Sequence, residues 1–494
     1  MASQDHQHIH VVFIPLMAQG HMIPMMDIAR LFARRGVMVT IITTPLNASR
    51  FQAVIDREMQ AGLQIELVQF PFPCKELGLP QGCDNVDLIP SQEMAVNFLK
   101  AVDFLQHPVE QFLQEHQTPV SCIISDTCLP WTCETASKFQ IPRIAFHGTC
   151  CFSLLSMLNI HCYKPYKTVA SELEPFVIPG LPHRIEITKS QLLVDMNANL
   201  ELQQVNEKLI EGDLKSYGVV VNSFEELEPE YVESYQKACG KKVWTVGPVS
   251  LCNTEIVDRA ERGNKASIDE HECLSWLDSR KPRSVVYACF GSISILAPSH
   301  LIEIGLGLEA SKHTFIWVIR KDQKCSEVEE WLSGGFEERV KERALIIRGW
   351  APQMLILSHA AIGGFLSHCG WNSTLESISV GVPMIACPVF AEQFFNEKLI
   401  VHVLKTGVSV GVKAAIKWGQ EKRVFVKMEE VKKAVERLMD EGEEGEERRK
   451  RARELGEKAR SAMEEGGSSY NNITLLIQDI INLANKNWNA KGEA

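Results

Sequence analysis

The sequence predicts an α/β protein built from two doubly wound, Rossmann-like domains. Three observations lead to this fold class. The chain has 494 residues, enough for two domains of ordinary size. Short β-branched runs alternate with segments of helical period, which is typical of parallel sheets covered by helices. The order strand, small-residue turn, helix opens the chain and starts again near Ser284.

The first half begins with a strand and a helix. Residues 9–14 form a β-branched run that predicts a buried strand. Residues 17–21 are expected to form a loop, and Pro24 suits the first turn of the next helix. Residues 37–43 predict the next strand, so a parallel sheet starts here. Further strands are predicted at 121–126, 141–146 and 218–222, with helices and loops that line a site between 150 and 200.

The second half repeats this order after a polar, weakly patterned segment, residues 252–271, that is expected to be an inter-domain linker. Strands are predicted within 284–292, 315–319 and 344–348, and charged helices within 427–465. We therefore divide the chain into a first domain (1–250), a linker (251–283), a second domain (284–470) and a C-terminal helix (471–494).

Composition excludes several classes of function. The net charge of −11 argues against a polyanion-binding surface, so no nucleic-acid partner is expected. The 15 cysteines show no C-x-x-C pair, which favours reduced thiols in the cytoplasm. The apolar run after the polar N-terminus is too short for a signal peptide, and no stretch of about 18 apolar residues predicts a membrane span.

The most informative stretch runs from Trp350 to Gln393. Residues 362–374 predict a short strand, a sharp turn at Gly370 and a helix. Ser373 to Glu376 have the spacing of a capping box, so the helix is expected to begin there. The free N–H groups and the dipole of a helix start suit a phosphate or pyrophosphate. The spacing alone fits an ordinary strand-to-helix connection equally well.

Two polar residues are expected at the carboxyl edge of the first sheet, where sites of α/β proteins lie. His21 follows the first strand, and Asp126 ends a neighbouring strand. An imidazole can act as a general base near neutral pH, and a carboxylate on its other nitrogen stabilises the imidazolium. A lone histidine in a loop is more often a surface or packing residue, so the pair is a hypothesis at this point.

Two other patterns argue against nicotinamide and metal chemistry. Residues 305–310 match G-x-G-x-x-A, but they lie within a run of helical spacing and not directly after a strand, so we discount a dinucleotide site. A D-x-D motif, whose two carboxylates can hold a metal ion, does not occur in the sequence. Asp84 and Asp87 are one residue too far apart for it. We therefore expect no metal and no cofactor.

The stretch from Trp350 to Gln393 resembles, over all 44 positions, the signature box of the plant UDP-dependent glycosyltransferases of secondary metabolism. Residues 20–36 and 391–400 are similar to the same family. The resemblance implies a GT-B fold, in which two Rossmann-like domains face a cleft and the C-terminal helix packs back on the first domain. It also implies a monomer that binds a UDP-sugar donor and a hydrophobic small-molecule acceptor.

Residue by residue, the resemblance implies a catalytic pair and a set of donor contacts. His21 and Asp126 fall on the catalytic pair. The residues implied to bind the UDP-sugar are Trp350 at the uracil, Gln353 at the nucleoside, Glu376 at the ribose, Ser292, His368, Gly370, Asn372 and Ser373 at the diphosphate, Trp371, Glu392 and Gln393 at the sugar, and Ala351 beside Trp350 with no particular contact assigned.

Some of these positions have a simpler interpretation. Ser373 and Glu376 fit helix capping, and Trp350 fits a core position. Glu392 departs from the aspartate that is commoner in the family, which puts its sugar contacts in doubt. Gln393 goes with a glucose preference in the family.

The expected reaction is inverting O-glucosylation of a hydrophobic acceptor, with a triterpenoid or flavonoid hydroxyl favoured over a plant hormone or another aglycone. One alternative is a non-catalytic nucleotide-sugar-binding protein, which would keep the box and lose the catalytic pair. The other is an NAD(P)-dependent oxidoreductase, supported only by the misplaced glycines of residues 305–310.

Overall fold

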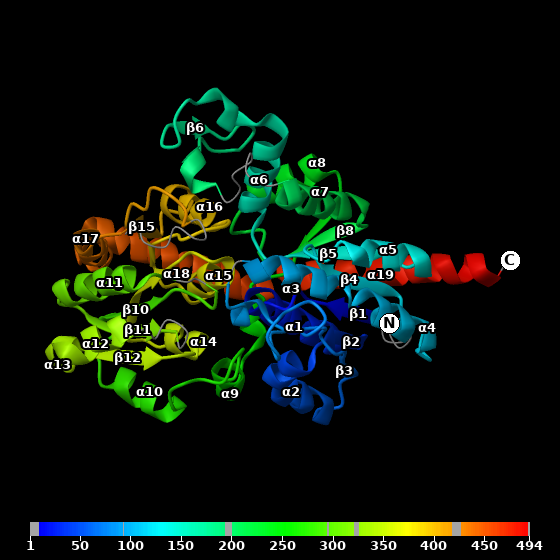
Figure 1. The fold of residues 1–494 in the computed structure, drawn as a ribbon, viewed down its shortest axis with the longest axis horizontal. Helices are drawn as coiled ribbons and strands as arrows, with labels where there is room; N and C mark the ends of the chain where they lie inside the picture. The colour runs from blue at the N-terminus through cyan, green and yellow to red at the C-terminus, as the bar shows by residue number, and fades with distance from the viewer. Residues whose placement is uncertain are drawn as a thin grey trace.

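Two parallel sheets form the framework of the protein (Figure 1). The computed structural model describes residues 9–91, 93–192, 200–293, 296–320, 326–416 and 426–492. The first sheet has the order β3-β2-β1-β4-β5-β8-β9, and the second has the order β12-β11-β10-β13-β14-β15. In each sheet the winding direction reverses beside the first strand, at β1 or β10, which is the switch point where ligands of such sheets bind. The predicted doubly wound fold is confirmed.

The strands agree with the sequence to within two residues wherever a strand was predicted. The first sheet contains β1 (His10–Ile14), β2 (Met38–Thr43), β3 (Ile65–Gln69), β4 (Cys122–Asp126), β5 (Arg143–His147), β8 (Gly218–Val221) and β9 (Lys242–Thr245). The second contains β10 (Val285–Cys289), β11 (Thr314–Ile319), β12 (Ala344–Arg348), β13 (Ile362–Ser367), β14 (Met384–Ala386) and β15 (Gly407–Ser409). A separate antiparallel pair is formed by β6 (Pro175–Val177) and β7 (Glu186–Thr188).

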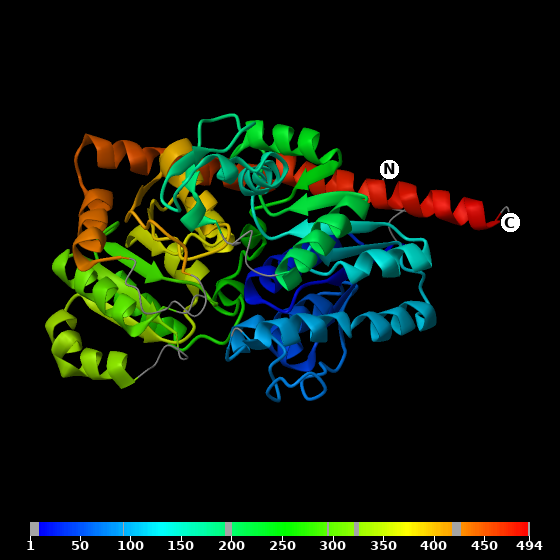
Figure 2. The same ribbon diagram turned by 45° about the horizontal axis from the view of Figure 1, so that its top comes forward.

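Helices cover both faces of each sheet (Figures 1 and 2). The first half contains α1 (Gln19–Ala33), α2 (Pro45–Gln60), α3 (Glu93–Asp103), α4 (Gln106–Glu115), α5 (Trp131–Phe139), α6 (Cys151–Tyr163), α7 (Leu200–Lys215) and α8 (Pro229–Cys239). The rest of the chain contains α9 (Ile256–Ala260), α10 (Glu270–Asp278), α11 (Pro298–Ala310), α12 (Ser326–Trp331), α13 (Glu337–Val340), α14 (Gln353–Leu357), α15 (Trp371–Val380), α16 (Gln393–Lys398), α17 (Met428–Met439), α18 (Glu443–Met463) and α19 (Ser468–Gly492).

The last helix joins the two halves. The chain leaves α18 of the second half, and α19 then runs along the first half (Figure 2). Ile473, Leu476 and Ile480 on this helix belong to the same buried apolar cluster as β1 and β4. Full burial of one such side chain contributes about 1.5–3 kcal/mol, so this row of contacts stabilises the arrangement substantially.

The segment expected to be an inter-domain linker has more structure than its polar composition suggests. It includes α9 and α10, and Cys273 and Leu277 of α10 are fully buried against the second sheet. Asn253 and Asp258 are also buried, beside α1. Polar residues can lie inside a protein when they pair with one another, and such pairing leaves no apolar pattern in the sequence.

The glycines of residues 305–310 pack helices together. Gly305 and Gly307 lie inside α11, as the sequence predicted. A Cβ atom at Gly305 would fall 2.6 Å from the Trp331 side chain, and one at Gly307 would fall 2.5 Å from Val431 of α17. These glycines therefore permit close helix contacts, and they are not at a strand-to-helix turn.

Within the described ranges, no helix combines the length and the apolar character needed to cross a bilayer. The described cysteines are all free thiols, and most of them are buried.

Candidate active site

A cavity of about 570 Å³ lies between the carboxyl ends of the two sheets. Its walls come from the segments that follow β1 and β5 on one side and β10, β12, β13 and β14 on the other. His21 lines the cavity, and so do all the predicted donor-binding residues: Ser292, Trp350, Ala351, Gln353, His368, Gly370, Trp371, Asn372, Ser373, Glu376, Glu392 and Gln393. Asp126 is fully buried behind His21.

His21 lies in the first turn of α1 and not in a loop, so the loop predicted for residues 17–21 is wrong. The prediction relied on Pro24 as a residue of the first turn, but Pro24 is inside the helix. A proline has no N–H and cannot donate to the carbonyl group four residues earlier, which belongs to Gly20. Asn372 of α15 donates to that carbonyl at 2.6 Å. The proline is tolerated here because the other half of the protein supplies the missing donor.

His21 in the first turn of α1 and Asp126 at the end of β4 form a hydrogen-bonded pair. The distance from His21 Nδ1 to Asp126 Oδ2 is 2.6 Å. The other carboxylate oxygen accepts the backbone N–H of Cys128 at 2.9 Å, and Arg143 donates to the Asp126 carbonyl oxygen at 3.0 Å. The carboxylate is therefore held in place. An Nδ1–H donated to Asp126 leaves the lone pair on Nε2, which makes no hydrogen bond to any described residue.

The electrostatics of the pair favour an ionised carboxylate and a more basic imidazole. Burial lowers the pKa of His21, but the charge and the hydrogen bond of Asp126 raise it more, so it lies above its ordinary value of 6.5. Burial raises the pKa of Asp126, but the charge and the hydrogen bond of His21, with the N–H of Cys128, bring it below its usual range. The two shifts have the signs that a base and its supporting carboxylate require.

The turn from β13 into α15 offers backbone donors to the cavity. The helix begins at Trp371 with Gly370 as its N-cap and has no side-chain cap, so the predicted capping box is wrong. The Ser373 hydroxyl instead accepts from Gln353 Nε2 at 3.1 Å. A Cβ atom at Gly370 would lie 2.4 Å from the His368 ring, which explains why glycine occupies the turn.

His368 is a neutral donor or acceptor in this turn. Its ring is packed between Gly370 and Gly291, where a Cβ atom would lie 2.5 Å from the imidazole. Burial lowers the pKa of His368 to about 4, and the charge of Arg320 acts in the same direction. The imidazole is therefore uncharged at neutral pH, and the helix terminus supplies positive potential without a cation on this ring.

A half-buried indole, an amide and a carboxylate also line the cavity. Gly263 packs on the Trp350 ring, where a Cβ atom would lie 2.5 Å away. Gln353 Nε2 donates to Glu376 Oε2 at 2.7 Å. The other oxygen of Glu376 accepts from Arg262, in the segment before α10.

The three residues predicted to contact the sugar, Trp371, Glu392 and Gln393, have different bonding partners in the structure. The Trp371 indole is buried and donates to the Asn222 carbonyl at 2.7 Å, so it links the two halves. Gln393 Oε1 accepts the N–H groups of Val389 and Phe390 at 2.9 and 3.1 Å. Burial raises the pKa of Glu392, while backbone N–H groups and the charge of His21 oppose this shift.

Sequence reasoning missed the contribution of residues 252–267. Arg262 and Asn264 line the cavity, and Asn264 accepts from Gln19 Nε2 of α1 at 2.6 Å. The cations Arg259, Arg262 and Lys265 recur every three residues and all line the cavity. That spacing was the available signal, because an anionic ligand needs cations near it.

One group of possible metal ligands exists in the part of the chain that the structure describes. It consists of His21, Asp126 and Cys128, whose ligand atoms lie within 4.8 Å of one another. Burial raises the pKa of the Cys128 thiol well above its ordinary value, and the charge of Asp126 adds to the shift. A protonated thiol is a poor ligand, since the thiolate binds metals, and Nδ1 of His21 is already bonded to Asp126.

The fold and the cleft place the protein among the GT-B glycosyltransferases. The family model described as UDP-glucoronosyl and UDP-glucosyl transferase matches residues 10–419. UDP-glycosyltransferase 73C3 of Arabidopsis thaliana is 53% identical over 97% of this chain and 98% of its own. UDP-glycosyltransferase 73C12 of Barbarea vulgaris is also 53% identical, over the same shares. The chain therefore belongs to the plant UDP-glycosyltransferase family, as its signature box indicated.

Solved structures agree with this assignment. A crystal structure of UGT73P12 from Glycyrrhiza uralensis, complexed with glycyrrhetinic acid 3-O-monoglucuronide, is 39% identical with a TM-score of 0.92, and the match covers 98% of each chain. A crystal structure of UGT89C1 from Arabidopsis thaliana, complexed with UDP-L-rhamnose, is 30% identical with a TM-score of 0.74, over 96% of this chain and 99% of that chain.

The effect of Asp126 on His21 can be measured directly. We expect a histidine Cε1 resonance, assigned by its loss in His21→Gln, to titrate with a pKa above 6.5. In Asp126→Asn the carboxylate charge is gone and burial remains, so the same pKa should fall below 6.5. NMR titration of histidine-labelled protein gives both values. An unchanged pKa in Asp126→Asn would mean that the carboxylate does not control the imidazole.

Proposed function

We propose that the protein transfers glucose from UDP-glucose to a hydroxyl group of a hydrophobic small molecule, with inversion at the anomeric carbon. One observation carries the proposal: the His21–Asp126 pair of the first half borders the same cavity as the N-terminus of α15 in the second. We propose that the half up to residue 250 holds the acceptor and that residues 284–470 hold the donor.

His21 acts as the general base in this proposal. Its Nε2 takes the acceptor proton while the acceptor oxygen attacks the anomeric carbon on the face opposite UDP. The new bond forms as the bond to the diphosphate oxygen breaks, so an α-linked donor gives a β-glucoside. Asp126 stays ionised and stabilises the imidazolium. General base catalysis of this kind contributes typically about 10²- to 10⁴-fold.

The developing charge on UDP is stabilised by the turns after β10 and β13. We assign the diphosphate to Ser292, the backbone N–H groups of the first turn of α15 and the neutral ring of His368. The side-chain donor of Asn372 is used by Gly20, so Asn372 contributes its backbone N–H. These donors, the helix dipole and the nearby arginines are the basis for proposing a reaction without a metal or cofactor.

The nucleoside is assigned to the other end of the cavity. Trp350 and Ala351 would hold the uracil by stacking and backbone contact, and Gln353 would hold the nucleoside. Glu376 accepts hydroxyls of the ribose in this proposal, since each carboxylate oxygen has a lone pair beyond the bond it already makes.

The acceptor is proposed to be a triterpenoid or flavonoid. UGT73P12 was solved with a glycyrrhetinic acid glucuronide, and another crystal structure of UGT89C1 holds quercetin, at 39% and 30% identity. Glucose is the proposed sugar, on the basis of Gln393. We also propose a monomer in the cytoplasm; the free thiols fit a reducing compartment, and sedimentation at the mass of one chain would support the monomer.

The proposal is tested by incubating the protein with UDP-glucose and a panel of hydrophobic aglycones. A gain of one hexose in the product, detected by mass spectrometry, and a β-anomeric coupling constant in its NMR spectrum are expected. Calorimetry should detect binding of UDP but not of NAD(P). Binding of UDP with no product for any aglycone would favour a non-catalytic nucleotide-sugar-binding protein, and binding of NAD(P) alone would favour an oxidoreductase.

The role of His21 gives a sharper prediction. His21→Ala should lower kcat by about 10²- to 10⁴-fold or more and leave UDP affinity unchanged, because Nε2 faces the acceptor and not the nucleotide. Steady-state kinetics and calorimetry provide the two readouts. His183→Ala is the matched control, since His183 is half-exposed and does not line the cavity. Equal loss of turnover and UDP affinity in His21→Ala would assign the residue to folding or to the donor site.

Gln393 provides a test of sugar selectivity. Its Oε1 is bonded to two backbone N–H groups, so Nε2 is the end that remains for a sugar hydroxyl. We expect Gln393→His to lower kcat/KM for UDP-glucose by roughly tenfold or more, and to affect UDP-galactose less, since a lost polar contact costs about 1–3 kcal/mol. Gln393→Glu keeps the acceptor atom and removes the donor, so it should also impair glucose transfer. Equal rates with several UDP-sugars in every variant would refute the assignment.

A further inference from the structure

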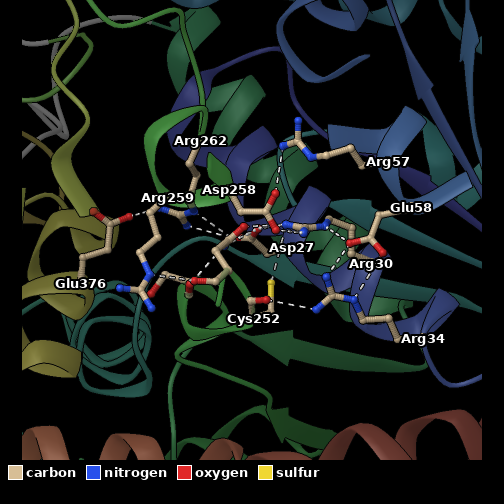
Figure 3. Close-up of polar contacts among 12 residues, drawn as sticks. Asp27, Arg30, Arg34, Arg57, Glu58, Cys252, Asp258, Arg259, Arg262 and Glu376 are labelled. Carbon is tan, nitrogen blue, oxygen red and sulfur yellow. Dashed lines mark hydrogen bonds and ion pairs between the residues drawn. The ribbon is translucent and has the colours of Figure 1, made fainter. Parts of the chain in front are cut away.

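Arg262 lies between two carboxylates that belong to different halves of the protein (Figure 3). Its Nη1 donates to Glu376 Oε1 on α15, and its Nε donates to Asp27 Oδ2 on α1 at 2.9 Å. The three side chains are between 4% and 8% exposed. Burial by itself lowers the pKa of Arg262, but the two carboxylates raise it more, so the guanidinium stays charged.

Asp27 belongs to a buried network of side chains from α1 and the linker. Asn253 Nδ2 donates to Asp27 Oδ1 at 3.0 Å, and Arg30 lies 3.6 Å from the same oxygen. Arg30 in turn pairs with Asp258 of α9 at 2.9 Å (Figure 3). The loss of one partner from such a buried network would leave an uncompensated charge. The intact network therefore resists rearrangement. Arg262 is therefore a fixed extension of α1 that reaches the nucleotide end of the cavity.

The contacts of Arg262 leave Glu376 in one orientation. One carboxylate oxygen accepts from Arg262 and the other accepts from Gln353 Nε2 at 2.7 Å. Arg262, Gln353 and Glu376 all line the cavity. A hydrogen bond to an ionised acceptor is roughly twice as strong as a neutral one, but only if the acceptor keeps its charge and direction. A buried carboxylate without Arg262 would lose its compensating cation.

We propose that Arg262 is a positioning residue for nucleotide recognition: it holds Glu376 in an orientation in which the carboxylate can distinguish a ribose from a deoxyribose. This inference rests on the proposed function, in which Glu376 accepts the ribose hydroxyls. It adds that the discrimination depends on the first half of the protein, through Asp27. Recognition of the ribose and closure of the cleft are then linked, because Arg262 can bond to both carboxylates only when α1 and α15 are close.

The test compares the affinities of UDP, 2′-deoxy-UDP and uridine, measured by calorimetry. Wild-type protein should bind UDP about tenfold or more tightly than 2′-deoxy-UDP, since the loss of a hydrogen bond to a charged group typically weakens binding by at least that factor. Glu376→Gln should reduce this ratio. Arg262→Gln should reduce it to a similar extent and raise the KM for UDP-glucose more than it lowers kcat.

Arg259 offers a matched control. It lies in the same segment and also lines the cavity, but its guanidinium donates to the backbone carbonyls of Asn253 and Thr254 and not to Glu376. Arg259→Gln removes the same charge, and we expect the ratio of UDP to 2′-deoxy-UDP affinity to stay near the wild-type value. If Arg262→Gln fails to fold, Arg262→Lys keeps the charge without the forked geometry, and an intermediate ratio is expected.

Each other outcome has a distinct meaning. A wild-type protein that binds UDP and 2′-deoxy-UDP equally would refute the proposed role of Glu376 itself. A preserved ratio in both Arg262 variants, with all affinities lowered equally, would make Arg262 a merely structural residue and overturn the inference. A loss of UDP affinity relative to uridine, with the ribose preference kept, would mean that Arg262 binds the diphosphate directly, which also overturns it.

Discussion

The hydrogen bond between His21 and Asp126 is the interaction on which the proposed chemistry of the cleft depends. It exists because β1 and β4 are parallel neighbours, so that the residues at their carboxyl ends meet at one edge of the sheet. Burial alone would lower the pKa of His21 and make it a weaker base. The charge of Asp126 reverses that effect, which explains why the carboxylate is placed behind the ring and away from solvent.

A second constraint joins the two halves of the protein around that pair. Asn372 donates to the Gly20 carbonyl, the Trp371 indole donates to the Asn222 carbonyl, and Arg262 pairs with Asp27 and Glu376. These contacts all cross between the two halves, and they are polar. The Arg262 pairs are buried, so a lost partner there would leave an uncompensated charge. These contacts therefore hold the two walls of the cleft in a defined relative position.

Much of the framework and the site could be predicted from the sequence. Buried apolar strands such as β1 and β10 have a clear pattern, and the signature box brought together residues that line the cavity. The strands β3 and β9 were missed because they are only partly buried, and β14 and β15 because three residues carry little periodicity. The start of α1 was misplaced because Pro24 is tolerated only through a bond from Asn372, a residue 348 positions later that no local rule can take into account.

The linker shows a different limit of sequence reasoning. Its arginines and acidic residues resemble a solvated surface, but Asp258 and Arg262 are buried in pairs with charges from α1 and α15. Pairing of distant charges depends on the folded arrangement, and composition alone does not reveal it. The capping-box prediction failed for a related reason, since the Ser373 hydroxyl bonds to Gln353 and not to its own helix.

The most direct measurement is the position of an acceptor in a crystal structure of the protein with UDP and an aglycone identified by screening. The reacting hydroxyl oxygen is predicted to lie about 2.6–3.2 Å from His21 Nε2, with the diphosphate at the N-terminus of α15. An acceptor hydroxyl bonded to another side chain, with His21 turned away from it in a closed complex, would contradict the account.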